Sequence, residues 1–429
     1  MRGPKGAEAW IGWPIAAGAL LFILAVTLIP AGQAHTISQN PFCIICGQAG
    51  LANILRNVLL FVPLGTGLSL LIRNPILAWI PTLALTVGIE TAQLWIPGRN
   101  ALLIDVAANA AGGAVGIAFI HALRDSATGS GNSKLVLFWR ALPFSVIVLT
   151  AWALQLAPPE PPHIMQLQPR LAHLAVYEGR VERAELGERQ IRLARIPDPE
   201  LLERQLFEGD TLVVDVTVEP RRWRTASLVS FYTHERRELF LLGVAADDVV
   251  LHLPFRAAAL RLTVPDLRLS GSLGALEEGS RAQIRYWASA EGLARAGACL
   301  SLNGIASESE PVTEVYFSKA CHLRPTLGDG WALLYFVAGL PGEAQRWIRF
   351  FWLLLLTLPA GLMARRWRWA LGLASGAGAT AWAAPILLGS LAVTPLAQVG
   401  VIGLGVGLGH LVRRSWLAWV PPRESAPLR

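Results

Sequence analysis

The sequence predicts a polytopic α-helical membrane protein with about eight transmembrane helices and an inserted extracytoplasmic all-β sandwich or jelly roll. Of the 429 residues, 53% are hydrophobic and 16% are charged, and the mean hydropathy is +0.45. Soluble chains carry about 25% charged residues. Long apolar runs fill both ends of the chain, and 25 of the 30 acidic residues lie in residues 158–345. This composition excludes a purely soluble enzyme, a disordered chain and a collagen-like chain.

Eight apolar runs are each long enough to cross a bilayer, which takes about 20 residues of helix. They are residues 11–31, 54–72, 76–96, 102–122, 139–157, 347–364, 369–389 and 394–412. The chain therefore divides into a membrane domain of five helices at 1–157, an extracytoplasmic linker and β-sandwich at 158–345, and three further helices with a cytoplasmic tail at 346–429.

Basic residues predict the orientation, because short loops rich in Arg and Lys stay in the cytoplasm. Those that flank the runs are Arg2, Lys5, Arg73, Arg124, Lys134, Arg140, Arg365, Arg366, Arg368, Arg413 and Arg414. They fall at alternate boundaries, so we expect both termini inside and residues 158–345 outside. The first run ends in Ala31–Ala34, which also fits a cleavage site, although its apolar core is longer than that of a usual signal peptide. The net charge of +7 combines arginine-flanked helices with an acidic insert, so it predicts no nucleic-acid partner.

All four cysteines fall in segments that this topology places outside the cytoplasm, where disulfides persist. We expect Cys299 to pair with Cys321. Cys43 and Cys46 are close enough in sequence for a structural bridge or loop brace, and their spacing also suits zinc binding or redox catalysis. Zinc would need two further ligands, so no metal and no cofactor is assigned.

Polar side chains interrupt three of the predicted membrane helices. Glu90 and Gln93 are three residues apart, and Asp105 and Asn109 are four apart, so each pair shares one helix face. Asn57 begins an inward-running helix, Glu90 ends an outward-running one and Asp105 begins the next, so all map to the outer half of the bilayer. We expect one outward-facing polar cluster, in which Arg99 or Arg56 neutralises Glu90 and Asp105.

Two interpretations of this cluster remain open. Ionisable residues in membrane helices usually mark a functional site. Polar side chains can instead hold neighbouring helices together, and the small residues Gly112, Gly113 and Gly116 would let those helices approach closely.

The same residues resemble the pattern of the VanZ-like membrane family. The resemblance covers roughly residues 10–125 and rests on motifs in the family's order and spacing. The motifs are Asn57…Phe61-x-Pro63-x-Gly65, Glu90-x-x-Gln93, Arg99, Asp105-x-x-x-Asn109-x-x-Gly112 and the preceding Cys43-x-x-Cys46-Gly47 loop. It implies a bacterial inner-membrane protein of the cell envelope, associated with low-level resistance to teicoplanin-type glycopeptides. The resemblance implies functional roles for Asn57, Glu90, Gln93, Arg99, Asp105 and Asn109, but it implies no established reaction. Arg56 departs from the residue pattern of the family.

The insert shows the short alternating runs of an all-β domain. We expect strands at 212–218, 227–232, 238–244, 249–253, 259–264, 282–287 and 298–302. Residues 205–325 are similar, without a sharp motif, to concanavalin A-like and laminin G-like lectin domains, which implies carbohydrate binding through aromatic faces and polar groups. The candidates are Trp223, Tyr232, Trp287 and Tyr316, each of which can instead be a core or interface residue. No paired carboxylates of a glycosidase occur on one strand.

Three functions compete. The first is a binding protein of the cell envelope, in which the polar cluster holds a lipid-linked ligand and the sandwich contacts glycan. The second is a membrane-embedded enzyme, with Glu90 or Asp105 as general base and Arg99 holding a phosphate or carboxylate. The third is a transporter, which the absence of an internal repeat disfavours. Membrane lipids are expected partners, and the sequence does not predict an oligomeric state.

Overall fold

The structure is a computed structural model, and it describes most of the chain. The described residues are 4–30, 42, 49–128, 149–156, 166–167, 176–191, 199–208, 210–220, 224–232, 238–253, 255–288, 298–305, 317–335, 340, 342–364, 366–388 and 391–419. The chain forms two compact units. One contains Met1–Ser145, Leu355–Gly376 and Gly403–Arg429, and the other contains Val146–Leu354 and Ala377–Ile402.

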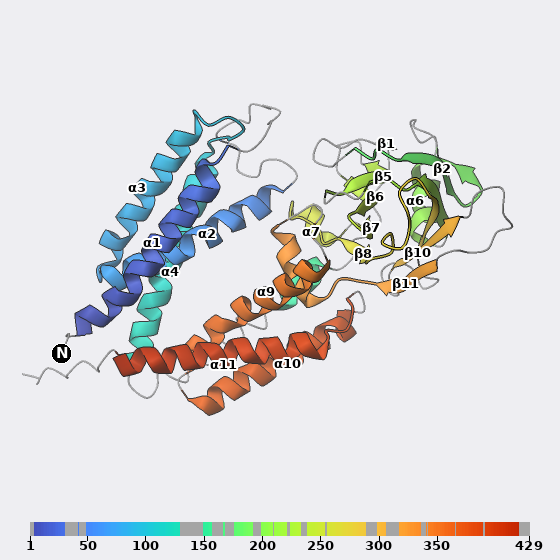
Figure 1. Cartoon of the computed structure of the whole chain (residues 1–429). Helices are drawn as coiled ribbons and strands as arrows, with labels where there is room; N and C mark the ends of the chain where they lie inside the picture. Colours follow the sequence, from blue (N-terminus) through green and yellow to red (C-terminus); the bar gives the residue numbers. More distant parts are fainter. Residues whose placement is uncertain are drawn as a thin grey trace, which may run out of the picture. The chain divides into compact units, whose positions relative to one another are not determined.

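Four long helices form the N-terminal part of the first unit (Figure 1). They are α1 (Pro4–Leu28), α2 (Gly50–Leu71), α3 (Pro75–Gln93) and α4 (Leu103–Thr128). Helix α3 begins where Asn74 accepts hydrogen bonds from the backbone N–H groups of Ile76 and Leu77. This side chain satisfies two of the donors that a helix start leaves without partners.

Small residues bring α2 and α4 into close contact. A Cβ atom at Gly112 would lie 2.1 Å from the Val58 carbonyl oxygen, and one at Gly116 would lie 2.2 Å from the Val62 carbonyl oxygen. Only glycine fits such an approach, so the prediction that these glycines serve close helix packing is confirmed. At the far end from Asp105, Arg124 of α4 binds Glu8 of α1 at 2.8 Å and the Ser69 carbonyl of α2 at 2.9 Å.

Seven helices in the described part of the chain are long and apolar enough to cross a membrane. They correspond to seven of the eight predicted spans, with ends that differ by a few residues. The last three are α9 (Gly342–Met363), α10 (Trp367–Leu388) and α11 (Leu396–Trp419). The remaining predicted span, 139–157, lies mostly outside the described residues, and its described part is helical from 149 to 155. The chain is therefore a multi-pass membrane protein.

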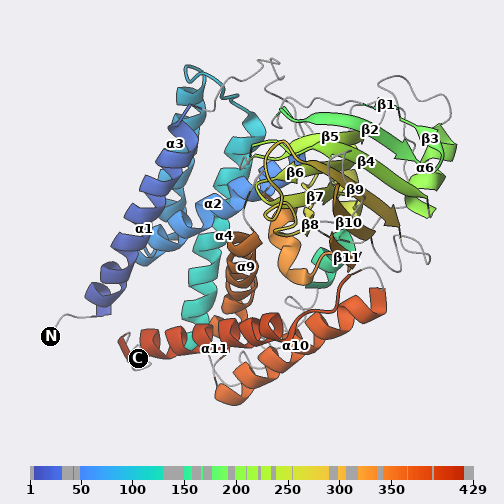
Figure 2. The ribbon, with the colours of Figure 1, turned by 45° about the vertical axis from the view of Figure 1, so that its right-hand side comes forward.

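In the sequence, the segment between these helix groups forms a β domain of two antiparallel sheets (Figure 2). The first has the order β1-β5-β6-β7-β8 and the second has the order β11-β10-β9-β4-β2-β3. The strands of the first sheet are β1 (Gln166–Leu167), β5 (Ala226–Tyr232), β6 (Glu238–Ala245), β7 (Asp248–His252) and β8 (Leu267–Leu269). Those of the second are β2 (Arg180–Leu186), β3 (Arg189–Gln190), β4 (Thr211–Thr217), β9 (Arg281–Ala288), β10 (Ala298–Ile305) and β11 (Phe317–Leu323).

Apolar side chains of the two sheets meet in a shared core. The Phe240 ring of β6 lies 4.9 Å from the Tyr286 ring of β9, measured between centroids. Strands β4 and β9 alternate between buried and more exposed residues, as strands with one buried face do. Helix α6 (Pro199–Glu208) contributes Leu206, whose carbonyl accepts a hydrogen bond from the Tyr286 hydroxyl.

The strand predicted at 259–264 is wrong. The chain forms a short helix there, α7 (Arg256–Ala259), followed by a turn in which Arg261 has a φ of 55°. Three consecutive alanines favour the helix, and the left-handed backbone at Arg261 ends it. The alternating pattern after Ala259 is therefore a turn that packs against the 3-10 helix η1 (Leu327–Leu333), where Thr263 N–H donates to the Leu333 carbonyl.

Candidate functional site

One part of the predicted polar cluster is centred on Asp105, which is buried and surrounded by half-buried residues of α2. Asp105 lies in the first turn of α4, and its Oδ1 accepts hydrogen bonds from Asn57 Nδ2 at 2.7 Å and Asn53 Nδ2 at 3.1 Å. Arg56 Nη2 lies 3.4 Å from Asn53 Oδ1, and its charge attracts the Asp105 carboxylate. Asn53, Arg56 and Asn57 share one face of α2 and are half-buried. We call Asp105, Asn53, Arg56 and Asn57 together the Asp105 patch.

Glu90 has a different partner. Its Oε2 accepts a hydrogen bond from the backbone N–H of Leu102 at 3.0 Å, just before the first residue of α4, and only 8% of the residue is exposed. A carboxylate at a helix N-terminus satisfies a free donor and complements the positive end of the helix dipole. Glu90 therefore anchors the start of α4 to the end of α3.

Gln93 and Arg99 both bind the C-terminal end of α1. Gln93 Nε2 donates to the Thr27 carbonyl at 3.1 Å. The Arg99 guanidinium donates to the carbonyls of Val26 at 2.6 Å and Ile29 at 2.9 Å. The last carbonyls of a helix lack partners within it and attract cations. Arg99 therefore caps α1, and Arg56 rather than Arg99 is the cation beside Asp105.

Asn109 joins α4 to α3. Its Nδ2 donates to Thr86 Oγ1 at 2.9 Å, and within the described residues its Oδ1 is buried and accepts no hydrogen bond. Trp79 Nε1 donates to the Ala110 carbonyl one residue further along α4.

The six residues predicted from the sequence thus separate into two groups. Asn57 and Asp105 belong to the Asp105 patch, which links α2 to α4. Glu90, Gln93, Arg99 and Asn109 link the other helices to one another. Sequence reasoning missed Asn53, although it lies four residues before Asn57 and so on the same helix face. It also missed Thr86, because a threonine in an apolar helix gives no distinctive signal.

The aromatic candidates of the β domain also differ from one another. Trp223 and Tyr316 lie outside the described residues. Tyr232 is 2% exposed and its hydroxyl donates to Glu238 Oε2, so this side chain is part of the interior rather than a platform for a sugar. Trp287 is half-buried on β9, and Lys319 Nζ of β11 lies 5.1 Å from its ring centroid.

A row of planar polar groups lies on the same face of the second sheet as Trp287. Gln283 Nε2 donates to Asp215 Oδ1 at 2.8 Å, and Arg285 Nε donates to Gln283 Oε1 at 2.6 Å. Arg183 of the neighbouring β2 pairs with Asp215 at 3.1 Å. Alternation along β9 places Gln283, Arg285 and Trp287 on this face, away from the core residue Tyr286.

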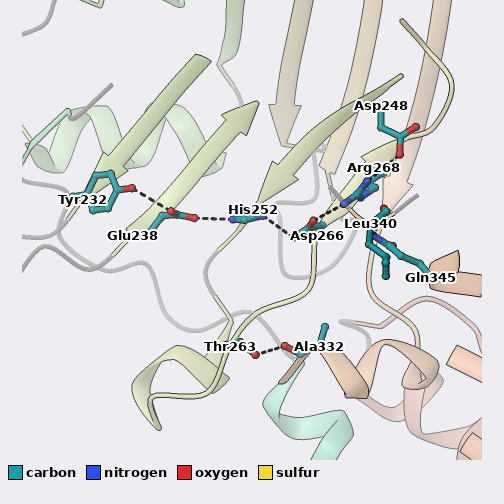
Figure 3. A network of polar contacts seen from close by, with 10 residues as sticks. All are labelled: Tyr232, Glu238, Asp248, His252, Thr263, Asp266, Arg268, Ala332, Leu340 and Gln345. Atoms are coloured by element: carbon teal, nitrogen blue, oxygen red, sulfur yellow. Dashed lines mark hydrogen bonds and ion pairs between the residues drawn. The ribbon is translucent and has the colours of Figure 1, made fainter. Parts of the chain in front are cut away.

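A chain of alternating charges crosses the first sheet and is the main polar feature that the sequence did not predict (Figure 3). His252 lies between two carboxylates, with Nδ1 2.7 Å from Glu238 Oε1 and Nε2 2.6 Å from Asp266 Oδ1. Arg268 pairs with Asp266 at 2.8 Å and with Asp248 at 3.1 Å. Acidic and basic side chains alternate along the row in the order Glu238, His252, Asp266, Arg268, Asp248.

The surroundings of His252 keep it charged. Burial lowers its pKa, but the carboxylates of Asp266 and Glu238 raise it by more, to about 10. The pKa of Asp266 shows the reverse balance: burial raises it, and the cations of His252 and Arg268 lower it below its usual value. At neutral pH the row therefore consists of ion pairs whose side chains are at most 16% exposed.

Helix α9 reaches this row and η1. With its amide oriented to suit the Arg268 donors, Gln345 accepts from Arg268 Nε at 3.0 Å. Arg349 Nε donates to Asp329 Oδ1 at 2.6 Å, and Asp329 also caps η1 through the backbone N–H of Thr326. The first turns of α9 are thus fixed to the β domain.

The expected disulfide between Cys299 and Cys321 is confirmed, and it joins the neighbouring strands β10 and β11. Cys43 and Cys46 lie outside the described residues, so their pairing stays a prediction. Among the described residues, no group of three or more His, Cys, Asp or Glu side chains is placed to hold a metal ion.

Comparison with known proteins identifies one similar region. Residues 16–124 match the family model described as VanZ/LLP1. No curated protein and no solved structure matches the chain. The matched region contains α2, α3, about half of α1 and most of α4, and with them the Asp105 patch.

Proposed function

We propose that this VanZ-like, multi-pass membrane protein of the cell envelope binds the headgroup of a lipid-linked ligand at the Asp105 patch. The observation that supports this is the composition of the patch. A buried carboxylate, two amides and a half-buried guanidinium meet within the first turns of α2 and α4.

The depth of the patch suits a headgroup. Asn57 lies seven residues into α2, which is about 10 Å of helix axis. The interfacial layer on each side of a bilayer is about 5–7.5 Å thick, because the hydrocarbon core takes about 30 Å of the roughly 40–45 Å total. Asp105, the third residue of α4, lies within this depth, and Asn57 extends the patch to the outer edge of the hydrocarbon core. The predicted orientation puts this end of α2 at the outer surface of the bacterial inner membrane.

The chemistry of the patch favours a phosphate beside hydroxyl groups. A guanidinium binds phosphate oxygens through parallel hydrogen bonds. The Asp105 hydrogen bonds from Asn53 and Asn57 both use Oδ1, and within the described residues Oδ2 accepts none. This second oxygen suits a hydroxyl donor such as that of a sugar. A lipid-linked sugar phosphate meets both requirements.

The β domain supports the same proposal with a second surface. Trp287 and the polar row of Gln283, Arg285 and Asp215 resemble the aromatic and planar polar groups to which sugars bind. In the predicted topology this domain lies on the same side of the membrane as the Asp105 patch. Retention of such a ligand would connect the protein to the glycopeptide tolerance associated with VanZ-like proteins.

Native mass spectrometry of the intact protein in mild detergent tests the proposal. We compare wild type with an Asp105→Asn/Arg56→Gln variant, in which both charges are removed. The matched control is Arg73→Gln, because Arg73 follows the other end of α2 and its side chain is 50% exposed.

We expect wild type and the control to retain one specific lipid-linked adduct, and the double variant to retain at least about tenfold less, a loss of about 1.4 kcal/mol. If all three proteins carry the same bulk lipid, the Asp105 patch is not a headgroup site. If the double variant only loses thermal stability, the patch joins helices.

A further inference from the structure

The β domain contains a cavity of about 500 Å³ at one end of its two sheets. Its walls come from the ends of β4 and β6, from the residues before β2 and from the turn between β8 and β9. The lining includes Tyr177, Val216, Glu219, Val244, Leu273 and Ala275. This volume lies within the range of about 300–1,000 Å³ that is usual for small-molecule sites.

The floor of the cavity is apolar. Val216, Val244 and Leu273 are 2%, 6% and 6% exposed and belong to the core between the sheets. An apolar floor favours a ligand with a hydrocarbon or aromatic body, because removing apolar surface from water is favourable in proportion to its area.

The rim and walls are acidic. Glu219, Glu277 and Glu278 contribute three carboxylates, and among the described lining residues none is Lys, Arg or His. Glu277 and Glu278 are exposed, whereas Glu219 is 8% exposed and its Oε2 accepts the Glu178 N–H at 2.5 Å. The electrostatic potential inside the cavity therefore favours a cation.

Tyr177 adds an aromatic wall. Its hydroxyl donates to the Thr217 carbonyl at 2.7 Å, which fixes the ring at the cavity wall. Burial, together with the Glu219 carboxylate, raises the pKa of this phenol, so the ring stays neutral at physiological pH. Aromatic rings attract organic cations within about 6 Å of their centroid.

We propose that this cavity binds an organic cation, an ammonium group attached to an apolar or aromatic body. The three carboxylates and the Tyr177 ring attract the ammonium group, and the valine and leucine floor takes the body. A bare metal ion fits less well, because the side chains of the floor are valine and leucine, which supply no oxygen ligands. This site lies in the β domain and is separate from the Asp105 patch, so neither proposal depends on the other.

The test uses the full chain in lipid nanodiscs and three aromatic probes of similar size. They are benzyltrimethylammonium as the cation, benzyl alcohol as the neutral probe and benzoate as the anion. Saturation-transfer NMR and isothermal titration calorimetry measure binding at low ionic strength, where electrostatic attraction is strongest.

Two variants and one control locate the site. Glu277→Gln/Glu278→Gln removes two exposed carboxylates and keeps Glu219, whose contact with Glu178 contributes to the fold. Ala275→Trp fills the cavity and keeps its charge. Glu343→Gln removes a glutamate that is 75% exposed and lies outside the cavity.

We expect the cation to bind wild type and Glu343→Gln at least tenfold more tightly than benzyl alcohol, with no measurable binding of benzoate. The double variant should lose about tenfold in affinity, and Ala275→Trp should lose binding. Equal binding of cation and neutral probe, or unchanged binding to Ala275→Trp, would overturn the proposal. So would the absence of binding to wild type at millimolar probe.

Discussion

At the scale of single residues, His252 shows how neighbours determine a charge. The side chain is 4% exposed, a position in which an isolated histidine would be neutral. Carboxylates on both ring nitrogens instead hold it as a cation, and Arg268 continues the alternation. The folded state therefore depends on a proton that the unfolded chain releases near pH 6.5.

This dependence predicts how stability varies with pH. Because the folded pKa of His252, about 10, exceeds the unfolded value, its stabilisation is complete below about pH 6.5 and disappears as pH rises towards 10. His252→Gln should cost about 3–5 kcal/mol at pH 6, since it removes the cation that lies between the carboxylates of Glu238 and Asp266. The cost should be smaller at pH 10. Thermal unfolding of both proteins in nanodiscs at pH 6, 8 and 10 measures it.

His322→Asn is the matched control for this experiment. His322 is an exposed histidine of the same domain, and asparagine tolerates its φ of 58°. It should leave the pH dependence unchanged. Parallel stability curves for wild type and His252→Gln would show that His252 is not the titrating group.

At the scale of elements, the packing of α2 against α4 depends on the absence of side chains. Gly112 faces the Val58 carbonyl and Gly116 faces the Val62 carbonyl, one helix turn apart. The same contact brings Asn57 and Asp105 within hydrogen-bond distance, so the Asp105 patch depends on it.

A single methyl group should separate these helices. We expect Gly112→Ala to destabilise the membrane domain by about 1–3 kcal/mol or more, because its Cβ would lie 2.1 Å from a backbone oxygen that cannot move alone. Gly88→Ala in α3 is the control, since nothing lies within 4 Å of its added methyl group. Thermal unfolding in nanodiscs measures the stability of both variants. Equal stabilities of Gly112→Ala and Gly88→Ala would contradict this account of the contact between α2 and α4.

Periodicity predicted the elements better than it predicted their partners. Apolar length is a local property, so seven of the eight expected spans correspond to described helices. Strands β4, β5, β6, β7, β9 and β10 also begin within about two residues of their predicted starts, because alternation shows where one face is buried. The strand predicted at 259–264 was wrong, because a turn can also show alternating apolar and polar residues.

The candidate site was predictable only in part. The spacing of Asp105 and Asn109 placed both on one face of α4, but they bind different helices: Asp105 binds α2 and Asn109 binds α3. Arg99 binds backbone carbonyls of α1, which no sequence pattern marks. The row from Glu238 to Asp248 joins residues of β6, β7 and β8, so only the folded sheet brings it together.

At the scale of the whole molecule, the orientation in the membrane is open to direct measurement. Arginines at alternate span boundaries predict that Arg73 faces the cytoplasm and that Glu343, at the start of α9, faces outwards. The Cys299–Cys321 bridge agrees with this, because disulfides persist outside the cytoplasm.

Single cysteines introduced at the two positions test the orientation. In a Cys43→Ser/Cys46→Ser background, Glu343→Cys should react with a membrane-impermeant maleimide in intact spheroplasts. Arg73→Cys should react only after permeabilisation. The opposite labelling pattern would invert the topology and place the Asp105 patch at the cytoplasmic surface.

The alternating row in the β domain also constrains how this protein can change over evolutionary time. Replacing a single charged residue of the row by a neutral one leaves a neighbouring buried charge uncompensated; the row consists of Glu238, His252, Asp266, Arg268 and Asp248. Replacing a whole ion pair with apolar side chains of similar volume is far better tolerated. The five positions should therefore be inherited as a set. In related sequences they are expected to be all present, or to disappear in matched acid–base pairs, and Gln345 is expected to vary with Arg268.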